Sequence, residues 1–187
     1  MNSKQPQYNK TQWLDNALKH LIQFGPQQLK IANLCNAFNV TKGSFYHHFK
    51  NRDDFVHALM QYWYEQTTLN FIAQADTQSS PLEKLNRLDQ VIATNNIEAE
   101  VHIRAWSLTE PFIAEHLKKI DTHRQTYLQT CYQELGLPAE LAHKLAIMSY
   151  AQFLGLLHLK PQPSIHQCLE LSTLLAKSFL QDIHKDI

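Results

Sequence analysis

Residues 31–55 read IANLCNAFNVTKGSFYHHFKNRDDF, and this stretch decides how the chain folds. A short apolar pattern runs from Ile31 to Phe38 and breaks at Asn39, a residue type that tolerates the left-handed backbone of a tight turn. Thr41 then fits the N-cap of a new helix, because its hydroxyl can accept from the free amides of the first turn. Two short helices joined by such a turn predict a helix-turn-helix.

The second of these helices, predicted over residues 42–49, has two chemically different faces. Phe45 and Phe49 lie four positions apart and are predicted to face the core. The remaining positions carry an ammonium group, hydroxyls and imidazoles, which are donors suited to phosphates and base edges in a major groove. These positions are Lys42, Ser44, Tyr46, His47 and His48. Gly43 would let a phosphate approach closely.

The stretch GPQQLKIANLCNAFNVTKGSFYHHFKNRDDF, residues 25–55, resembles the N-terminal DNA-binding domain of the TetR family of bacterial transcriptional regulators. The core TKGSFYHHF is similar to that family in residue type and spacing. Asn39 stands where the family usually has Gly, and Leu34-Cys35 where it usually has Ile-Ala; both changes suit the same geometry. The resemblance implies DNA contacts from Thr41, Lys42, Ser44, Tyr46, His47, Lys50 and Arg52. The alternative interpretation is an ordinary helical hairpin with a polar face.

Composition indicates an all-α chain with a basic end. The 187 residues include only 4 glycines, long apolar-periodic stretches dominate, and no segment alternates as a strand would. The net charge is +0 overall, but residues 1–55 hold seven Lys and Arg against three Asp, a net +4, which leaves −4 for the remainder. A basic module on an acidic body is expected when one end of a protein meets phosphates.

Helical periodicity and capping signals divide the chain into about nine helices. The predicted helices cover residues 10–24, 31–38, 42–49, 52–75, 81–93, 96–107, 111–135, 139–159 and 165–184. Their predicted starts include Asn51, Ser80 with Glu83, Asn95 with Glu98, and Ser164 with Gln167. The resemblance to the TetR family implies a DNA-binding domain over residues 1–51 and an effector-binding and dimerisation domain over residues 52–187.

The C-terminal part carries a weaker resemblance to the same family. Residues 101–128, VHIRAWSLTEPFIAEHLKKIDTHRQTYL, are similar to a segment of some TetR-type ligand-binding domains. In that family the last two helices of each subunit form an intermolecular four-helix bundle. The segment YAQFLGLLHL, residues 150–159, is apolar on nearly every side, which fits such a role. We therefore expect a homodimer through residues 139–159 and 165–184, with two recognition helices roughly 34 Å apart on a pseudo-palindromic operator.

The resemblance also implies a small, mostly apolar effector held between helices of the C-terminal domain. The candidate lining residues are Trp63, Phe71, His102, Trp106, Tyr127, Cys131, Tyr150 and Phe153. Each of them fits plain core equally well. Arg104 and Arg124 are suited either to pairing with acids or to holding an anionic ligand. A second hypothesis within the class is a dimer that binds DNA without a small ligand and is tuned by a protein partner.

The cysteine pattern and the hydropathy of the chain indicate in which cellular compartment the protein works. Cys35, Cys131 and Cys168 are scattered without a CxxC pair, which is typical of reduced thiols in the cytoplasm. The polar N-terminus MNSKQPQY is unlike a signal peptide, and no apolar run reaches the length of a membrane span. We expect a cytoplasmic protein with no membrane partner.

Catalytic and metal-binding motifs do not stand out. His116 and His123 lie seven apart on one helical face, but no third ligand completes a set with zinc-type spacing. The sequence has no GxSxG, Gly-rich phosphate loop or HExxH. We therefore expect no enzyme activity, no metal and no cofactor. The resemblance to the TetR family implies instead a ligand-responsive repressor that binds a palindromic operator as a homodimer. The alternative from another class is a TetR-fold small-molecule-binding or scaffold protein without operator binding.

Overall fold

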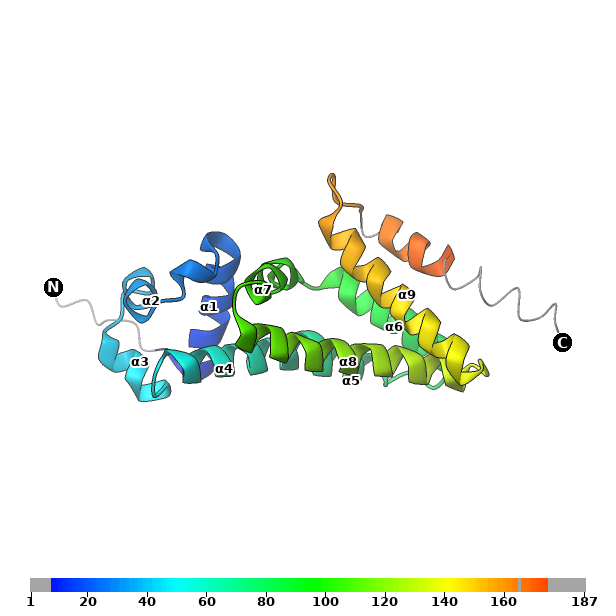
Figure 1. Cartoon of the computed structure of the whole chain (residues 1–187), viewed down its shortest axis with the longest axis horizontal. Coiled ribbons are helices and arrows are strands. Elements are labelled where there is room, and N and C mark those ends of the chain that lie inside the picture. The colour runs from blue at the N-terminus through cyan, green and yellow to red at the C-terminus, as the bar shows by residue number, and fades with distance from the viewer. Residues whose placement is uncertain (1–7, 165, 175–187) are drawn as a thin grey trace. The chain divides into compact units, whose positions relative to one another are not determined.

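The computed structural model describes residues 8–164 and 166–174, and within these ranges helices are the only regular elements (Figure 1). The α-helices are α1 (Lys10–Phe24), α2 (Ile31–Ala37), α3 (Lys42–His48), α4 (Arg52–Tyr64), α5 (Asn70–Ala75), α6 (Pro81–Thr94), α7 (Ala99–Ser107), α8 (Pro111–Glu134) and α9 (Ala139–His158). A 3-10 helix, η1 (Pro26–Gln28), follows α1, a π-helical segment (Glu65–Leu69) joins α4 to α5, and residues 166–174 are helical. The predicted all-α fold is confirmed.

Most predicted helix starts are confirmed by side-chain caps. The hydroxyl of Thr41 accepts from the Ser44 amide at 3.2 Å and opens α3. The Asn51 side chain accepts from the Asp54 amide at 2.8 Å and opens α4. Reciprocal capping boxes, in which each side chain bonds the other residue's amide, join Ser80 to Glu83 and Ser164 to Gln167. These local signals fix where the chain changes direction.

Two predicted helices need correction, and a third extends beyond the described residues. The start expected at Asn95 was wrong, because its side-chain amide donates to the Val91 carbonyl at 2.7 Å and so ends α6; α7 begins at Ala99. The single helix expected over residues 52–75 contains the π-helical segment, where the Thr67 hydroxyl donates to the Trp63 carbonyl at 2.8 Å. Of the helix expected over residues 165–184, the part from 175 onward lies outside the described residues.

Contacts divide the chain into two compact units. Unit 1 comprises residues up to Thr67 together with Glu98–Leu117, and unit 2 comprises Thr68–Ile97 together with the chain from Lys118. In unit 1, α1 packs against α4 and α7, and α2 packs against α3. Its fully buried side chains include the rings of Trp13, Phe45, Phe49 and Phe55. Unit 1 therefore holds the predicted helix-turn-helix on an aromatic core.

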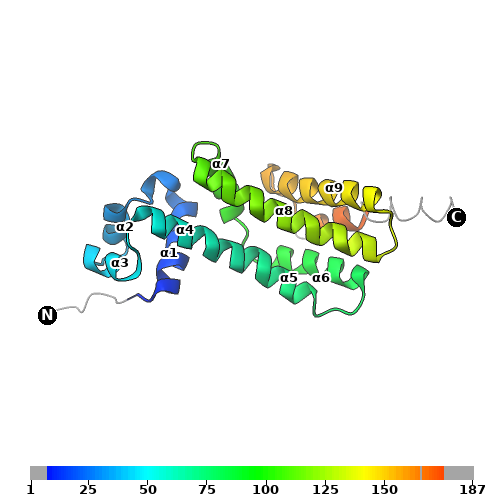
Figure 2. The ribbon, with the colours of Figure 1, turned by 60° about the horizontal axis from the view of Figure 1, so that its bottom comes forward.

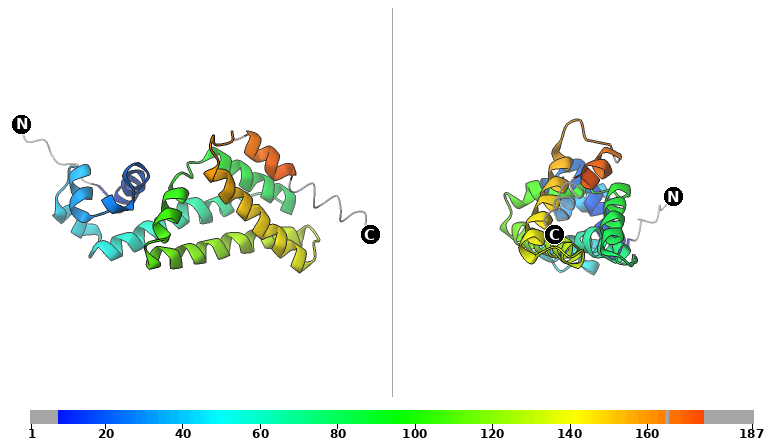
Figure 3. Two further views of the ribbon diagram at one scale, coloured as in Figure 1. Left: turned by 45° about the horizontal axis from the view of Figure 1, so that its top comes forward. Right: turned by 90° about the vertical axis from the view of Figure 1, so that its right-hand side faces the viewer.

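Unit 2 is a helical bundle in which α5 and α6 run side by side (Figure 2). Tyr132, Leu137, Ala142, Leu145 and Ala146 form a buried cluster between α8 and α9. Partly buried leucines at 85, 128, 135 and 141 pack against this cluster. The helical residues 166–174 follow α9 in the same unit (Figure 3). Within the described ranges, no helix has the length and hydropathy needed to cross a membrane.

Candidate nucleic-acid interface

The turn between α2 and α3 has the predicted backbone conformation. Asn39 has a φ of 53°, within the left-handed region that Asn tolerates. The Val40 amide donates to the Cys35 carbonyl at 2.9 Å, and the buried Cys35 thiol donates to the Thr41 carbonyl at 3.7 Å. These bonds join the end of α2 to the start of α3, so the helix-turn-helix predicted from residues 31–55 is present.

Two phenylalanines fix the orientation of α3 about its own axis. Phe45 is 0% exposed and Phe49, which ends the helix, is 1% exposed. The Phe45 ring lies 5.6 Å from the Trp13 ring of α1 and 5.6 Å from the Phe55 ring of α4, both measured between centroids. The Phe45–Trp13 contact is edge-to-face, an arrangement that is geometrically specific. The opposite face of α3 is therefore turned away from the core.

The outward face of α3 carries most of the predicted DNA-contacting residues. Thr41, Lys42, Tyr46, His47 and Lys50 are exposed, with Tyr46 retaining 54% of its surface, and Ser44 is half-buried. Arg52 lies on the first turn of α4, where its guanidinium is 4.0 Å from the Asp53 carboxylate. The structure therefore places Lys42, Tyr46 and His47 on one short helix, with Thr41 at its N-cap and Lys50 and Arg52 just beyond its C-terminal end.

Gly43 leaves space on this outward face. A Cβ added there would meet only the Thr41 hydroxyl, at 3.5 Å, an ordinary contact distance. The packing of unit 1 therefore does not require glycine at this position. Because Gly43 has no side chain, it leaves room between Lys42 and Ser44 for the close approach of a DNA strand.

His48 and Lys10 show what local sequence reasoning missed. The half-buried His48 donates from Nε2 to the Tyr8 carbonyl at 2.8 Å, so it holds the start of the described chain against α3. The exposed Lys10 ammonium lies 5.7 Å from the centroid of the Phe49 ring. Lys10 is therefore a further cation beside α3, and only its chain-distant contact with Phe49 reveals it.

The predicted effector-lining residues divide between the two units. In unit 1, Trp63 and Trp106 are buried and His102 is half-buried. The other five lie in unit 2, where three are buried and two are half-buried. The buried residues are Phe71, Cys131 and Tyr150, and the half-buried residues are Tyr127 and Phe153. Tyr150 and Phe153 stack with their centroids 6.0 Å apart.

The two arginines left open by the sequence have protein partners. Arg104 pairs with Glu100 at 2.8 Å on α7, and Glu100 is only 2% exposed. In unit 2, Arg124 donates from Nε to the Thr68 hydroxyl at 2.8 Å and from an Nη to the Tyr150 hydroxyl at 3.3 Å. The Tyr150 hydroxyl in turn donates to the Asp121 carboxylate at 2.6 Å. For Arg104, the structure shows pairing with an acid.

A second polar cluster in unit 2 surrounds Tyr127. Its hydroxyl donates to the Asp76 carboxylate at 3.0 Å, and the Lys84 ammonium lies 3.4 Å from the same carboxylate. Burial raises the pKa of the Tyr127 phenol and of the neighbouring Cys131 thiol. Both groups therefore stay protonated at neutral pH, which makes Cys131 a poor nucleophile.

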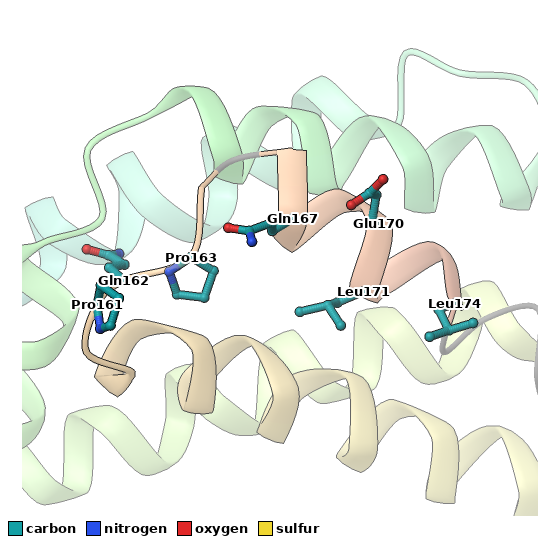
Figure 4. A pocket seen from close by; sticks show the side chains of 7 residues that line it. All are labelled: Pro161, Gln162, Pro163, Gln167, Glu170, Leu171 and Leu174. Atoms are coloured by element: carbon teal, nitrogen blue, oxygen red, sulfur yellow. The ribbon is translucent and has the colours of Figure 1, made fainter.

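An open groove of about 440 Å³ lies in unit 2 beside the 166–174 helix (Figure 4). It is lined by Pro161, Gln162, Pro163, Gln167, Glu170, Leu171 and Leu174. None of the eight predicted effector-lining residues is among them. Leu171 and Leu174 are 41% and 62% exposed, so this groove presents apolar surface to its surroundings.

The helix-turn-helix matches a known family. Residues 14–59 match the family model described as bacterial regulatory proteins, tetR family. That range contains α2, α3 and the part of α4 from Arg52 to Leu59. The predicted resemblance is therefore confirmed for this domain, and the family is one of regulators rather than enzymes. No curated protein matches the chain.

Solved structures extend the likeness to the whole fold. A transcriptional regulator from Rhodococcus sp. Rha1 has a TM-score of 0.75 at 14% identity, covering 93% of this chain and 97% of that one. A TetR-family regulator from Streptomyces coelicolor has a TM-score of 0.75 at 11% identity, covering 93% and 90%. A protein from Saccharomonospora viridis, described as a transcriptional regulator and crystallised in complex with choline, has a TM-score of 0.70 at 14% identity, covering 88% and 93%. The chain has the fold of TetR-family transcriptional regulators.

Proposed function

We propose that this protein is a ligand-responsive transcriptional repressor that binds a palindromic operator as a homodimer. The observation that carries the proposal is α3, where Phe45 and the following Phe49 are buried while the polar side chains of Lys42, Tyr46 and His47 form an exposed ridge. A helix anchored in this way presents a fixed set of donors to a major groove. The domain of residues 1–51 would read DNA, and residues 52–187 would bind effector and partner.

The chemistry of the ridge suits a duplex. Lys50 and Arg52 would bind phosphates beside the groove, and Lys10 would add a cation to the same side of α3. Ser44 would contact a base. The other exposed positions, Thr41, Lys42, Tyr46 and His47, would contact phosphates or base edges. The net +4 charge of residues 1–55 would draw this end toward DNA.

Dimerisation is supported by the outer face of α9. Ile147 and Met148 are 44% and 42% exposed, although α9 is strongly apolar in composition. Leu171 and Leu174 of the following helix are also exposed. An apolar surface of this kind is typical of subunit interfaces. We therefore assign the homodimer contact to residues 139–159 and 165–184.

The effector is proposed to bind among the helices of residues 52–187. The Saccharomonospora viridis structure with choline supports small-molecule binding by this fold. Effector binding would shift the spacing between the two DNA-reading helices of the dimer and so release the operator. A transcriptional repressor must reach the chromosome, and we therefore place this protein in the cytoplasm. No catalytic role, metal or cofactor enters the proposal.

Operator binding would be tested on the full chain by fluorescence anisotropy with duplex DNA selected from a random pool. Lys42→Ala and Tyr46→Phe should each weaken binding about five- to tenfold, as expected for one lost contact of about 1 kcal/mol. The Lys42→Ala variant should also reduce the slope of log K against log salt by about 1. Lys19→Ala is the matched control, because Lys19 is an exposed lysine of unit 1 that pairs with Asp15 on α1.

The rival account is a TetR-fold small-molecule-binding or scaffold protein without operator binding. It predicts that Lys42→Ala, Tyr46→Phe and Lys19→Ala behave alike, with no salt-dependent affinity for any selected duplex. Equal affinities across the three variants, with dimerisation intact, would support that account and overturn the proposed interface.

A further inference from the structure

Two histidines that are far apart in the sequence lie side by side in unit 1. His57 lies on α4 and His116 on the second turn of α8, and their ring centroids are 5.1 Å apart with an interplanar angle of 86°. The Phe112 ring, one turn before His116, is 4.3 Å from the His116 ring and 5.9 Å from the His57 ring, again between centroids. The fold thus pairs His116 with a histidine of another helix, whereas helical spacing alone pairs it with His123.

The hydrogen bond made by His116 decides which of its ring nitrogens is free. Nδ1 lies 2.9 Å from the Phe112 carbonyl oxygen, and because a carbonyl can only accept, Nδ1 carries the proton and donates. In the neutral imidazole, Nε2 then has an unshared lone pair. Histidines that bind metals are commonly held in this way, with one nitrogen donating to a carbonyl or carboxylate while the other binds the ion. His116 is therefore oriented as a ligand through Nε2.

His57 supplies a second imidazole at a suitable distance. It is exposed, and no hydrogen bond from the described residues occupies either of its ring nitrogens. A Zn–N bond is about 2.0–2.1 Å long, so two imidazoles on one tetrahedral ion have their ring centroids roughly 5 Å apart. The 5.1 Å separation of the two rings matches this value. Rotation of the exposed His57 ring about its Cβ–Cγ bond, a broad torsion in histidine, would direct a nitrogen toward the same ion.

We propose that His57 and His116 form a binding site for one divalent transition-metal ion of the class of Zn²⁺, Ni²⁺ and Cu²⁺, with water completing the coordination. Imidazole nitrogen suits these ions, whereas Mg²⁺ and Ca²⁺ prefer oxygen ligands. The described residues hold no group of three or more His, Cys, Asp or Glu placed to bind a metal, so this site has two protein ligands and stays open to water. The inference goes beyond the proposed DNA- and effector-binding function and does not depend on it.

The pairing of two helices distinguishes this site from other histidines of the chain. His158 on α9 makes the same bond from Nδ1 to a carbonyl, that of Leu154 at 2.8 Å, but no ring contact within the described residues joins it to a second histidine. His47 and His48 have ring centroids 4.8 Å apart, but they are adjacent on one helix, where successive side chains point in different directions. An ion on His57 and His116 would instead join two separate helices.

An ion bound here would hold α4 against the start of α8. The α4 helix begins directly after the helix-turn-helix, and its Phe55 ring lies 5.6 Å from the Phe45 ring and 5.2 Å from the Phe49 ring. An ion that binds only the folded arrangement stabilises it by mass action. The metal would therefore stabilise the unit that contains the DNA-reading helix.

The test uses the full chain without an affinity tag, freed of metal by a chelator, and the chlorides of Cu²⁺, Ni²⁺ and Zn²⁺ as probes. Calorimetry at pH 7.5 should show a tightest site of one ion per chain, with Cu²⁺ bound most strongly. His57→Ala and His116→Ala should each weaken that site at least tenfold. His158→Ala, the matched control, should bind as the wild type does. The ions should raise the midpoint of thermal unfolding of the wild type and of His158→Ala, but not that of His57→Ala.

Circular dichroism without metal should show the same helix content for His57→Ala and the wild type, because His57 is exposed. Three results would each overturn the inference: none of the ions binds, the tightest site survives both His57→Ala and His116→Ala, or His158→Ala weakens binding as much as they do. The last two results would mean an adventitious ion only. Because no DNA is present in this test, its failure leaves the operator proposal untouched, and a failure of operator binding leaves the metal site untouched.

Discussion

The helices α3 and α9 both have one buried and one exposed face, but the exposed faces differ in kind. On α3 the outward residues are a lysine, a tyrosine and a histidine, Lys42, Tyr46 and His47. On α9 they include Ile147 and Met148, whose side chains remain more than two-fifths exposed. A polar ridge suits phosphates and base edges, whereas an apolar face suits another apolar surface. The buried faces explain the fold, and the exposed faces indicate the partners.

Removing a buried ring of α3 should have the largest effect. Phe45→Ala should lower the free energy of unfolding by about 3–5 kcal/mol, because it leaves a cavity between α1, α3 and α4. The neighbouring Tyr46→Ala should change the stability by less than about 0.5 kcal/mol, because Tyr46 is exposed. Denaturant unfolding followed by circular dichroism measures both. Similar losses for the two variants would refute the two-faced description of α3.

The second largest effect is expected from a charged residue introduced on the outer face of α9. Ile147→Glu should weaken dimerisation at least a hundredfold, since each dimer would contain two buried, unpaired carboxylates at the contact. Sedimentation equilibrium gives the dissociation constant, and circular dichroism should show unchanged helicity. The control, His143→Glu, changes an exposed residue one turn nearer the polar start of α9. A dimer that survives Ile147→Glu would place the subunit contact elsewhere.

Replacing Asp89, a half-buried acid of α6, by asparagine (Asp89→Asn) should stabilise the protein at pH 7.5 by roughly 2 kcal/mol. The pKa of Asp89 is raised to about 6 in the folded state and is near 3.9 when unfolded, so ionisation costs stability as the pH rises from about 4 to 6. Below pH 4 both states are protonated and the benefit of the variant should disappear. Chemical unfolding between pH 3.5 and 7.5 measures the difference. A variant whose advantage does not change with pH would show that Asp89 is not desolvated.

The smallest effect concerns the cap of α3. Thr41→Ala should cost about 1 kcal/mol, because the Ser44 amide loses its acceptor, whereas Thr41→Ser should keep that bond and most of the stability. Unfolding free energies of the two variants, compared with that of the wild type, test this. Equal losses for Ala and Ser would mean that the methyl group, not the hydroxyl, matters at this position.

Features fixed by neighbouring residues were predictable from the sequence. The positive φ of Asn39, the caps at Thr41 and Asn51, and the inward direction of Phe45 and Phe49 all follow from residue type and helical spacing. The expected start at Asn95 failed because that side chain can serve either a following or a preceding helix. Local sequence does not decide between the two.

Features made by chain-distant contacts were not predictable. Arg124 donates to Thr68 across 56 positions, and the Lys10 ammonium reaches the Phe49 ring only because α1 and α3 pack together. The outward direction of the polar residues of α3 was therefore foreseeable, whereas these chain-distant contacts required the fold.

The most direct test of the central claim is selection of random duplex DNA on the purified full chain at near-physiological salt, followed by sequencing. The account predicts enrichment of an inverted repeat with half-sites about one helical turn apart, one for each α3 of a dimer. Lys42→Ala should reduce that enrichment and Lys19→Ala should keep it. The absence of any enriched motif, from protein shown to be folded and dimeric, would contradict the assignment of α3 as a reader of DNA.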